Sequence, residues 1–205
     1  MARTRPHPGV GLALAAVLLL STGAPAPPPL PELNGKVVAY ARANLGKVVG
    51  DGSCATLAIE ALREAGARSD PFVEGDGELA WGQPVESFKE GLPGDILQFH
   101  DAVFHGRKAT SRRRWITWHH EYPHHTAIVS RVSEGGNVVT VVHQNVTIHE
   151  KDGKDEKNVL EGPLRIDSLQ KGGWVRIYRP VAAPAYHRGA PAAKPDVDEP
   201  ARPES

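Results

Sequence analysis

The spacing of apolar residues predicts two helices in the first third of the chain, over residues 33–45 and 54–65. In the first segment Val38, Ala41 and Leu45 fall on one face, and Gly46 follows as a stop signal. The second segment follows the i, i+3, i+4, i+7 rule more closely. Its apolar positions are Cys54, Leu57, Ala58, Ala61, Leu62 and Ala65. Ser53 precedes this segment as an N-cap residue, and Gly66 follows it as a helix-ending glycine.

Beyond residue 92 the pattern changes to that of strands. Pro93-Gly94 is a type II turn signal, and the run "DILQF" after it predicts a strand. The runs "HTAIVSRV" and "NVVTVVHQNV" flank "SEGG", which indicates a hairpin, and "GWVRIYRP" predicts the last strand. Residues 67–92 and the basic stretch 101–122 are expected to be irregular, and "KDGKDEKN" to be a polar turn. Helices followed by antiparallel strands indicate an α+β fold with the helices on one face of the sheet.

The two ends of the chain differ from this middle part. Arg3 and Arg5 precede the apolar run "VGLALAAVLLL" and the small residues "STGAPA", a pattern typical of an export signal over residues 1–24. The alternative is an uncleaved N-terminal anchor. A Pro-rich linker over 25–32, a domain over 33–180 and a disordered Pro- and Ala-rich tail over 181–205 are expected to follow. The sequence thus predicts a secreted or periplasmic protein with no stable membrane insertion after signal removal.

Composition narrows the possible partners. The formal net charge is zero, so no nucleic-acid partner is expected. The chain has one cysteine, so it makes no internal disulfide. The simplest interpretation of Cys54 is a small buried hydrophobe. Its position at the start of a helix, however, favours the thiolate, because unpaired backbone N–H groups point there. A nucleophilic cysteine also needs a histidine, and His125, His143 and Asn145 lie on the expected hairpin.

Four segments in this order resemble the papain-like cell-wall hydrolases, the CHAP domains and their NlpC-type relatives. The segments are "LGKVVGDGSCATLAIEAL", "PGDILQF", "HHTAIVSRV" and "VVTVVHQNV". The resemblance implies a papain-like fold over roughly residues 34–180, with Cys54 as nucleophile and His125 as general base and acid. It leaves open whether His143 or Asn145 orients His125. The implied reaction is acyl transfer by an exported cysteine peptidase or amidase, with a peptidoglycan or other peptide amide as substrate and no cofactor.

The chain departs from these families at three places. Residue 143 is His where CHAP domains usually have Glu, and residue 53 is Ser where they usually have Gln. The aromatic residue common before the cysteine in NlpC-type enzymes is replaced by Val48-Val49. The change at residue 143 leaves open whether His143 or Asn145 orients His125. The other two changes concern the oxyanion hole, where the Ser53 hydroxyl and the Cys54 N–H are the tentative donors. They support an alternative function, a catalytically decayed cell-wall-binding module in which Trp115, Trp118 and the basic stretch contact anionic glycopolymers.

Histidine density raises a third hypothesis, a metal-binding protein. "HHEYPHH" places His119, His120, Glu121, His124 and His125 within seven residues. Adjacent histidines in a loop rarely point to one place, and no HExxH helix is present. We therefore assign no metal ligand from the sequence, and it indicates no oligomeric state.

The hairpin register determines which side chains can meet. Only one of two adjacent strand residues faces Cys54, and the resemblance selects His125 over His124. His125 lies opposite Asn145 and diagonal to His143 only if the hairpin has an odd loop or one bulge. We therefore expect Gly136 in the left-handed conformation, with His125, His143 and Asn145 on the face of Cys54. The thiol pKa is expected to be lowered.

Overall fold

The computed structural model describes residues 29–73, 78–148 and 154–184. The expected export segment, the first part of the linker and the tail from residue 185 lie outside the described residues, as does part of the polar turn at 151–158. Two helices, α1 (Glu32–Ala43) and α2 (Cys54–Ala65), precede most of the strands. Among the described residues, no helix is both long enough and apolar enough to cross a membrane.

Helix α2 has the boundaries and caps that its sequence predicts. The Ser53 hydroxyl accepts a hydrogen bond from the Thr56 N–H at 3.3 Å, and Gly66 adopts a left-handed conformation at φ 73°. Five of its apolar side chains are buried and one, Cys54, is half-buried. Helix α1 ends at Ala43, two residues before the expected end, so that Val38 and Ala41 are buried on its inner face while Leu45 lies beyond the helix and is exposed.

Six of the described strands form one antiparallel sheet in the order β3-β10-β4-β5-β6-β9. Their bounds are β3 Gln83–Val85, β4 Ile96–Ser111, β5 Arg114–Ser133, β6 Val138–His143, β9 Leu160–Arg165 and β10 Trp174–Arg179. Two short pairs accompany this sheet. They are β1 (Phe72–Val73) with β2 (Leu79–Ala80), and β7 (Val146–Ile148) with β8 (Lys154–Glu156). Short 3-10 turns span Phe88–Glu90, Glu134–Gly136 and Ile166–Ser168.

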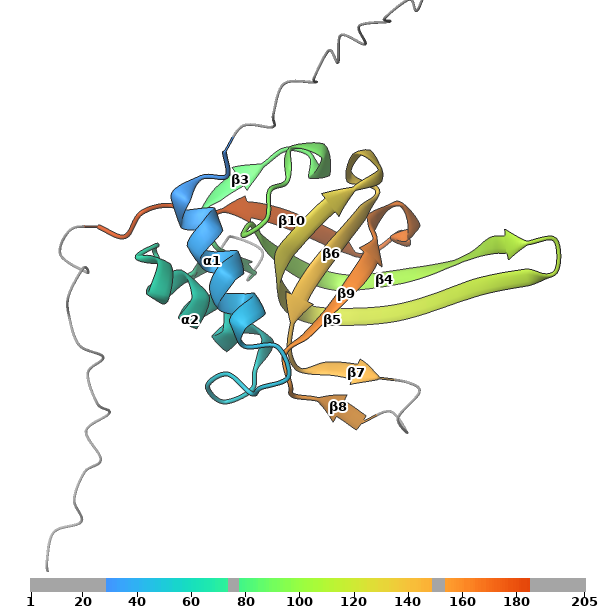
Figure 1. Cartoon of the computed structure of the whole chain (residues 1–205), viewed down its shortest axis with the longest axis horizontal. Coiled ribbons are helices and arrows are strands. Elements are labelled where there is room, and N and C mark those ends of the chain that lie inside the picture. Colours follow the sequence, from blue (N-terminus) through green and yellow to red (C-terminus); the bar gives the residue numbers. More distant parts are fainter. Residues whose placement is uncertain (1–28, 74–77, 149–153, 185–205) are drawn as a thin grey trace, which may run out of the picture.

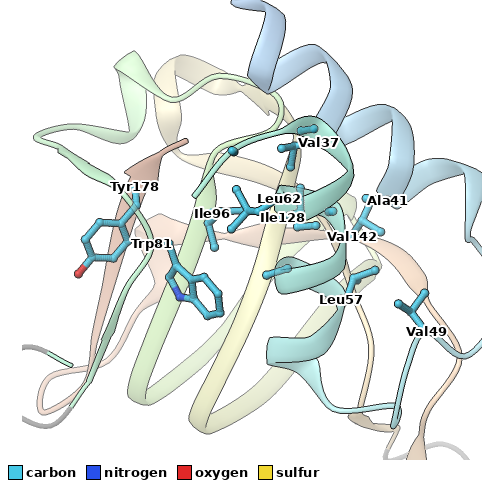
Figure 2. Close-up of a cluster of buried hydrophobic side chains, with 14 of the residues drawn as sticks. Val37, Ala41, Val49, Leu57, Leu62, Trp81, Ile96, Ile128, Val142 and Tyr178 are labelled. Atoms are coloured by element: carbon cyan, nitrogen blue, oxygen red, sulfur yellow. The ribbon is translucent and has the colours of Figure 1, made fainter. Parts of the chain in front are cut away.

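Both helices pack on one face of the sheet, which confirms the α+β expectation (Figure 1). Figure 2 shows Leu57 and Leu62 of α2 directed toward Ile96 of β4, Ile128 of β5 and Val142 of β6. All five side chains are at most 1% exposed. Burying this continuous apolar surface is the main force that holds the helices to the sheet.

A second core lies on the other face of the sheet. It contains the alternate residues of the same strands, including Leu97 and Phe99 of β4, Ala127 and Val129 of β5, and Val141 of β6. Side chains of successive strand residues point to opposite faces, so the two cores together fix the face of every residue between them.

The basic stretch 101–122 differs from the sequence expectation. It is the outer part of a long β4–β5 hairpin, which extends beyond the rest of the sheet as an arm (Figure 1). Most side chains of its outer end are exposed on both faces. A strand with two exposed faces has no need of apolar alternation, which is why its sequence does not indicate a strand. Residues 67–92, also expected to be irregular, include β1, β2 and β3.

The β5–β6 hairpin has the register that the sequence argument required. Ser133 pairs with Val138 beside the turn, and a bulge at Ser130 then shifts the ladder, so that Val129 pairs with Val141. Gly136 has φ +95°, as expected. The shift thus occurs at Ser130 within β5, instead of at the turn, where we expected it.

Candidate functional site

Cys54 lies in the first turn of α2, and the segment before it is held by hydrogen bonds. The Asp51 carboxylate accepts from the Ser53 N–H at 2.9 Å and from the Thr56 hydroxyl at 2.7 Å. The Ser53 hydroxyl is itself 2.7 Å from the Thr56 hydroxyl. Ser53 therefore acts as a helix cap, and its proposed contribution to an oxyanion hole stays a prediction.

Gln144 is a site residue that the sequence analysis did not single out. Its amide group donates to the carbonyls of Val49 at 3.0 Å and Ser53 at 2.6 Å, and its oxygen accepts from the Val49 N–H at 3.1 Å. The side chain is fully buried. Gln144 therefore ties the end of β6 to the segment that positions Cys54. In the sequence, the position of Gln144 between the two candidate site residues His143 and Asn145 was the feature that could have indicated its role.

The neighbour of the Cys54 thiol on β5 is Thr126. Burial raises the pKa of the Cys54 thiol, although the N–H and hydroxyl of Thr126 and the first backbone N–H groups of α2 act in the opposite direction. The thiol is therefore protonated near neutral pH, whereas its place at a helix start predicted a lowered pKa.

His125 and His143 form a pair on the second core. His125 Nε2 lies 3.1 Å from His143 Nδ1, the diagonal contact that the register predicts. The His125 ring stacks on Tyr122 with 4.8 Å between centroids. Burial, with a smaller effect of His143, lowers the pKa of His125 well below its usual range. Burial, with a smaller effect of His120, lowers the pKa of His143 to about 4. Both imidazoles are therefore neutral at pH 7, and one N–H donates to the other ring.

The register places the side chains of β5 on known faces. Thr126 and Ile128 face α2, so His125 and Ala127 between them face the second core, because β5 pairs with β4 without a bulge over residues 124–128. The Cys54 thiol accepts from the backbone N–H of Thr126, which points along the plane of the sheet. Among the described residues, no hydrogen bond joins Cys54 to His125.

Asn145 does not join the ladder. Strand β6 ends at His143, and Asn145 follows in a positive-φ conformation (59°) with an exposed side chain. The structure thus brings His125 and His143 together, with the Cys54 thiol beside Thr126 and Asn145 outside the ladder. The catalytic roles assigned to these residues stay predictions.

A cleft of about 470 Å³ lies on the second face, between the arm and strands β6 and β9. The arm contributes Lys108, Ile116, Trp118, His120 and Tyr122 to its wall, and the strands contribute residues that include Val141, His143, Leu164 and Arg165. The lining is mainly apolar and aromatic, and its charged residues are Lys108, Arg165 and Glu134; Cys54 is not part of it. His143 therefore belongs both to the lining of this cleft and to the buried histidine pair.

A polar cluster lies on the first face, near Thr126. Gln98 of β4 accepts from the Thr126 hydroxyl at 2.9 Å and from the Trp81 ring N–H at 2.9 Å, and its amide donates to Glu78 at 3.0 Å. Glu78 in turn contacts His100 and His124. Their ligand atoms lie within 4.8 Å of one another, so these three side chains can hold a metal ion.

Two N-terminal helices on an antiparallel sheet, with a cysteine at the start of the second helix, define a papain-like cysteine proteinase fold. Residues 32–189 match the family described as the AIM3/BBC1 cysteine proteinase-fold domain, and the chain belongs to this family. Comparison with curated proteins and with solved structures gives no match.

Proposed function

We propose that this domain uses its cysteine proteinase fold to bind a ligand in the cleft between the arm and β6/β9, and that it does not hydrolyse amide bonds. One observation carries this proposal. The thiol of Cys54 has a raised pKa, and its hydrogen-bond partners among the described residues are the donors of Thr126 and of the first turn of α2, whereas His125 is paired with His143. A cysteine nucleophile needs the thiolate and an imidazole within hydrogen-bond reach.

The chemistry of the cleft supports a glycan or peptide ligand. Trp118 and Tyr122 offer flat rings on which sugar or peptide groups can pack, and Lys108 offers a positive charge. Arg165 also lines the cleft, where it pairs with Glu134 at 3.4 Å and with Asp167 at 2.7 Å. Trp118 is held in place because its ring N–H donates to Ser168 at 2.9 Å and Arg165 lies over its face. Together with the expected export signal, these groups favour a cell-wall polymer, and we propose peptidoglycan as the ligand.

Co-sedimentation with purified peptidoglycan tests this binding. Trp118→Ala should weaken retention at least about 10-fold, which corresponds to roughly 1.4 kcal/mol of binding free energy. Phe72→Ala is the control, because Phe72, like Trp118, is an aromatic residue with an arginine over its ring, but it is exposed and lies outside the cleft. Equal retention of the wild type and both variants would contradict binding in this cleft.

The second candidate is a cysteine hydrolase of the CHAP or NlpC type that cleaves peptidoglycan amides. It is supported by the half-buried thiol at the start of α2 and by the two donors of Thr126, which favour the thiolate. In this candidate Cys54 attacks the amide carbonyl and a histidine protonates the leaving amine. The family resemblance assigns this histidine as His125, whereas His124 contacts Glu78 at 2.8 Å.

Digestion of peptidoglycan followed by mass analysis separates the two candidates. If the domain only binds, wild type and Cys54→Ala release no fragments. Fragments released by the wild type but not by Cys54→Ala would establish the hydrolase. A comparison of His124→Ala with His125→Ala would then identify the base. Ready alkylation of Cys54 at about pH 6 would also favour the hydrolase, because an ordinary thiol has a pKa of roughly 8.5.

A further inference from the structure

Three side chains from distant parts of the sequence converge beside β4 and β5. His100 Nδ1 lies 2.6 Å and His124 Nδ1 lies 2.8 Å from the same oxygen of Glu78, Oε1. The two histidines are directly paired across the β4–β5 ladder, so their side chains share a face. Glu78 is 5% exposed, and a carboxylate in such a place requires strong partners.

Groups behind these side chains fix their orientation. The second oxygen of Glu78 accepts from the Gln98 amide at 3.0 Å. The other ring nitrogen of His100 lies 3.5 Å from the Asp101 carboxylate, and Trp174 stacks on the ring with 5.3 Å between centroids. A metal-binding histidine usually donates its second N–H to such a carboxylate, which sets the tautomer and leaves the first nitrogen to the metal.

We propose that Glu78, His100 and His124 form a zinc site. Two imidazoles and one carboxylate are a donor set that Zn²⁺ takes in proteins, with bonds of about 2.0–2.2 Å. In a tetrahedral site such ligand atoms lie about 3.3 Å apart, so each histidine nitrogen must move less than about 1 Å away from the Glu78 oxygen. The two histidine nitrogens, which lie within 4.8 Å of each other, must come to the same separation. His124 is exposed and has room to move, and its exposure leaves the fourth position open to water or a small ligand.

The other residues of "HHEYPHH" do not take part in this site. His119 lies 2.8 Å from Glu121, and His125 pairs with His143 on the far face of the sheet. The ladder skips Asp101 and Pro123, where Asp101 has φ 45°, so that His120 lies on the second face together with His125. His124 is the histidine of this run that contacts Glu78. The proposed site therefore depends on His100 and Glu78, neither of which belongs to the histidine-rich run.

Zinc titration of the full chain, without a histidine tag and stripped with chelator, tests the proposal. Calorimetry and elemental analysis should find one tightly bound Zn²⁺ in the wild type. His124→Ala and Glu78→Gln should weaken binding by more than about 100-fold, and Asp101→Asn by about 10-fold. His119→Ala is the matched control, an exposed histidine of the same strand whose removal should leave the affinity unchanged.

Thermal unfolding shows whether a variant has lost the site or its fold. At a zinc concentration about 100-fold above the dissociation constant, the melting temperature of the wild type and of His119→Ala should rise by about 5 °C or more. His124→Ala should keep a cooperative transition that zinc does not shift. Absence of tight binding by the wild type, or unchanged binding by both His124→Ala and Glu78→Gln, would overturn the proposal.

Discussion

A shift of one residue along β5 decides which chemistry the thiol of Cys54 encounters. Thr126 faces α2 and offers a hydroxyl and an N–H, neither of which removes a proton from the thiol. His125, next to it, is enclosed by Phe99, Tyr122 and His143. Burial keeps the His125 imidazole neutral. The pair packs in the second core, and His143 also lines the cleft.

The buried histidine pair makes stability depend on pH. Since the pKa of His143 is about 4 in the folded state and roughly 6.5 when unfolded, its contribution is present above pH 6.5 and is lost as the pH falls through 4. We expect the free energy of unfolding to fall by about 3 kcal/mol between pH 7 and pH 4 from this group. Urea unfolding at several pH values measures it. His143→Gln should show a shallower dependence than wild type, and equal slopes would contradict a buried neutral His143.

At the scale of elements, the β5–β6 hairpin depends on a turn and a bulge that are held by different contacts. The bulge residue Ser130 accepts two hydrogen bonds from Arg42 of α1 and donates one to Glu161 of β9. The turn needs positive φ at Gly135 and Gly136. The bulge brings His143 within reach of His125, because it shifts the ladder by one residue on one strand.

The two turn glycines form a matched pair for mutation. A Cβ at Gly136 would lie 2.7 Å from the backbone nitrogen of Lys89, whereas one at Gly135 would meet nothing within 4 Å. Gly135→Ala should cost about 1–2 kcal/mol of unfolding free energy, the cost of positive φ alone. Gly136→Ala should cost clearly more, because the Phe88–Glu90 turn must also move. Equal losses in urea unfolding would show that the contact with Lys89 carries no strain.

The individual helices, turns and strands show where prediction from sequence succeeded and where it failed. Helix α2, its caps, and the Pro93-Gly94 turn with Gly94 at φ +87° follow from local signals. The arm could not be predicted, because its outer residues pack against little and show no apolar period. The metal cluster could not be predicted either, because no spacing rule joins Glu78 to His100 and His124.

For the whole molecule, Asp95 is the residue that joins the helical layer to the sheet. Its buried carboxylate accepts from Asn34 of α1 at 2.8 Å, from the Leu92 N–H at 2.8 Å and from Arg179 of β10 at 3.2 and 3.0 Å. Charge-assisted hydrogen bonds of this kind are about twice as strong as neutral ones. One side chain thus connects three elements that are far apart in sequence.

Removal of this carboxylate should be costly. Asp95→Ala leaves Arg179 and Asn34 without their partner and should lower the free energy of unfolding by about 3–5 kcal/mol. Asp167→Ala removes the partner of Arg165 on the surface and should cost at most about 1 kcal/mol. Chemical denaturation of the two variants gives the comparison. Similar losses for both would mean that burial of Asp95 does not set its contribution.

The sequence by itself determined helix α2, the central strands and the fold class, because helix caps, turn residues and apolar periods act over a few neighbouring positions. The meeting of His125 and His143 depends on the tertiary structure, because the turn pairs Ser133 with Val138 and only the bulge at Ser130 brings the two rings together. The tertiary structure also decided which face of the sheet each histidine occupies. The helices cover the face of Ile128 and Thr126, and that choice is set by packing among residues far apart in sequence. The same packing brings Glu78 to His100 and His124.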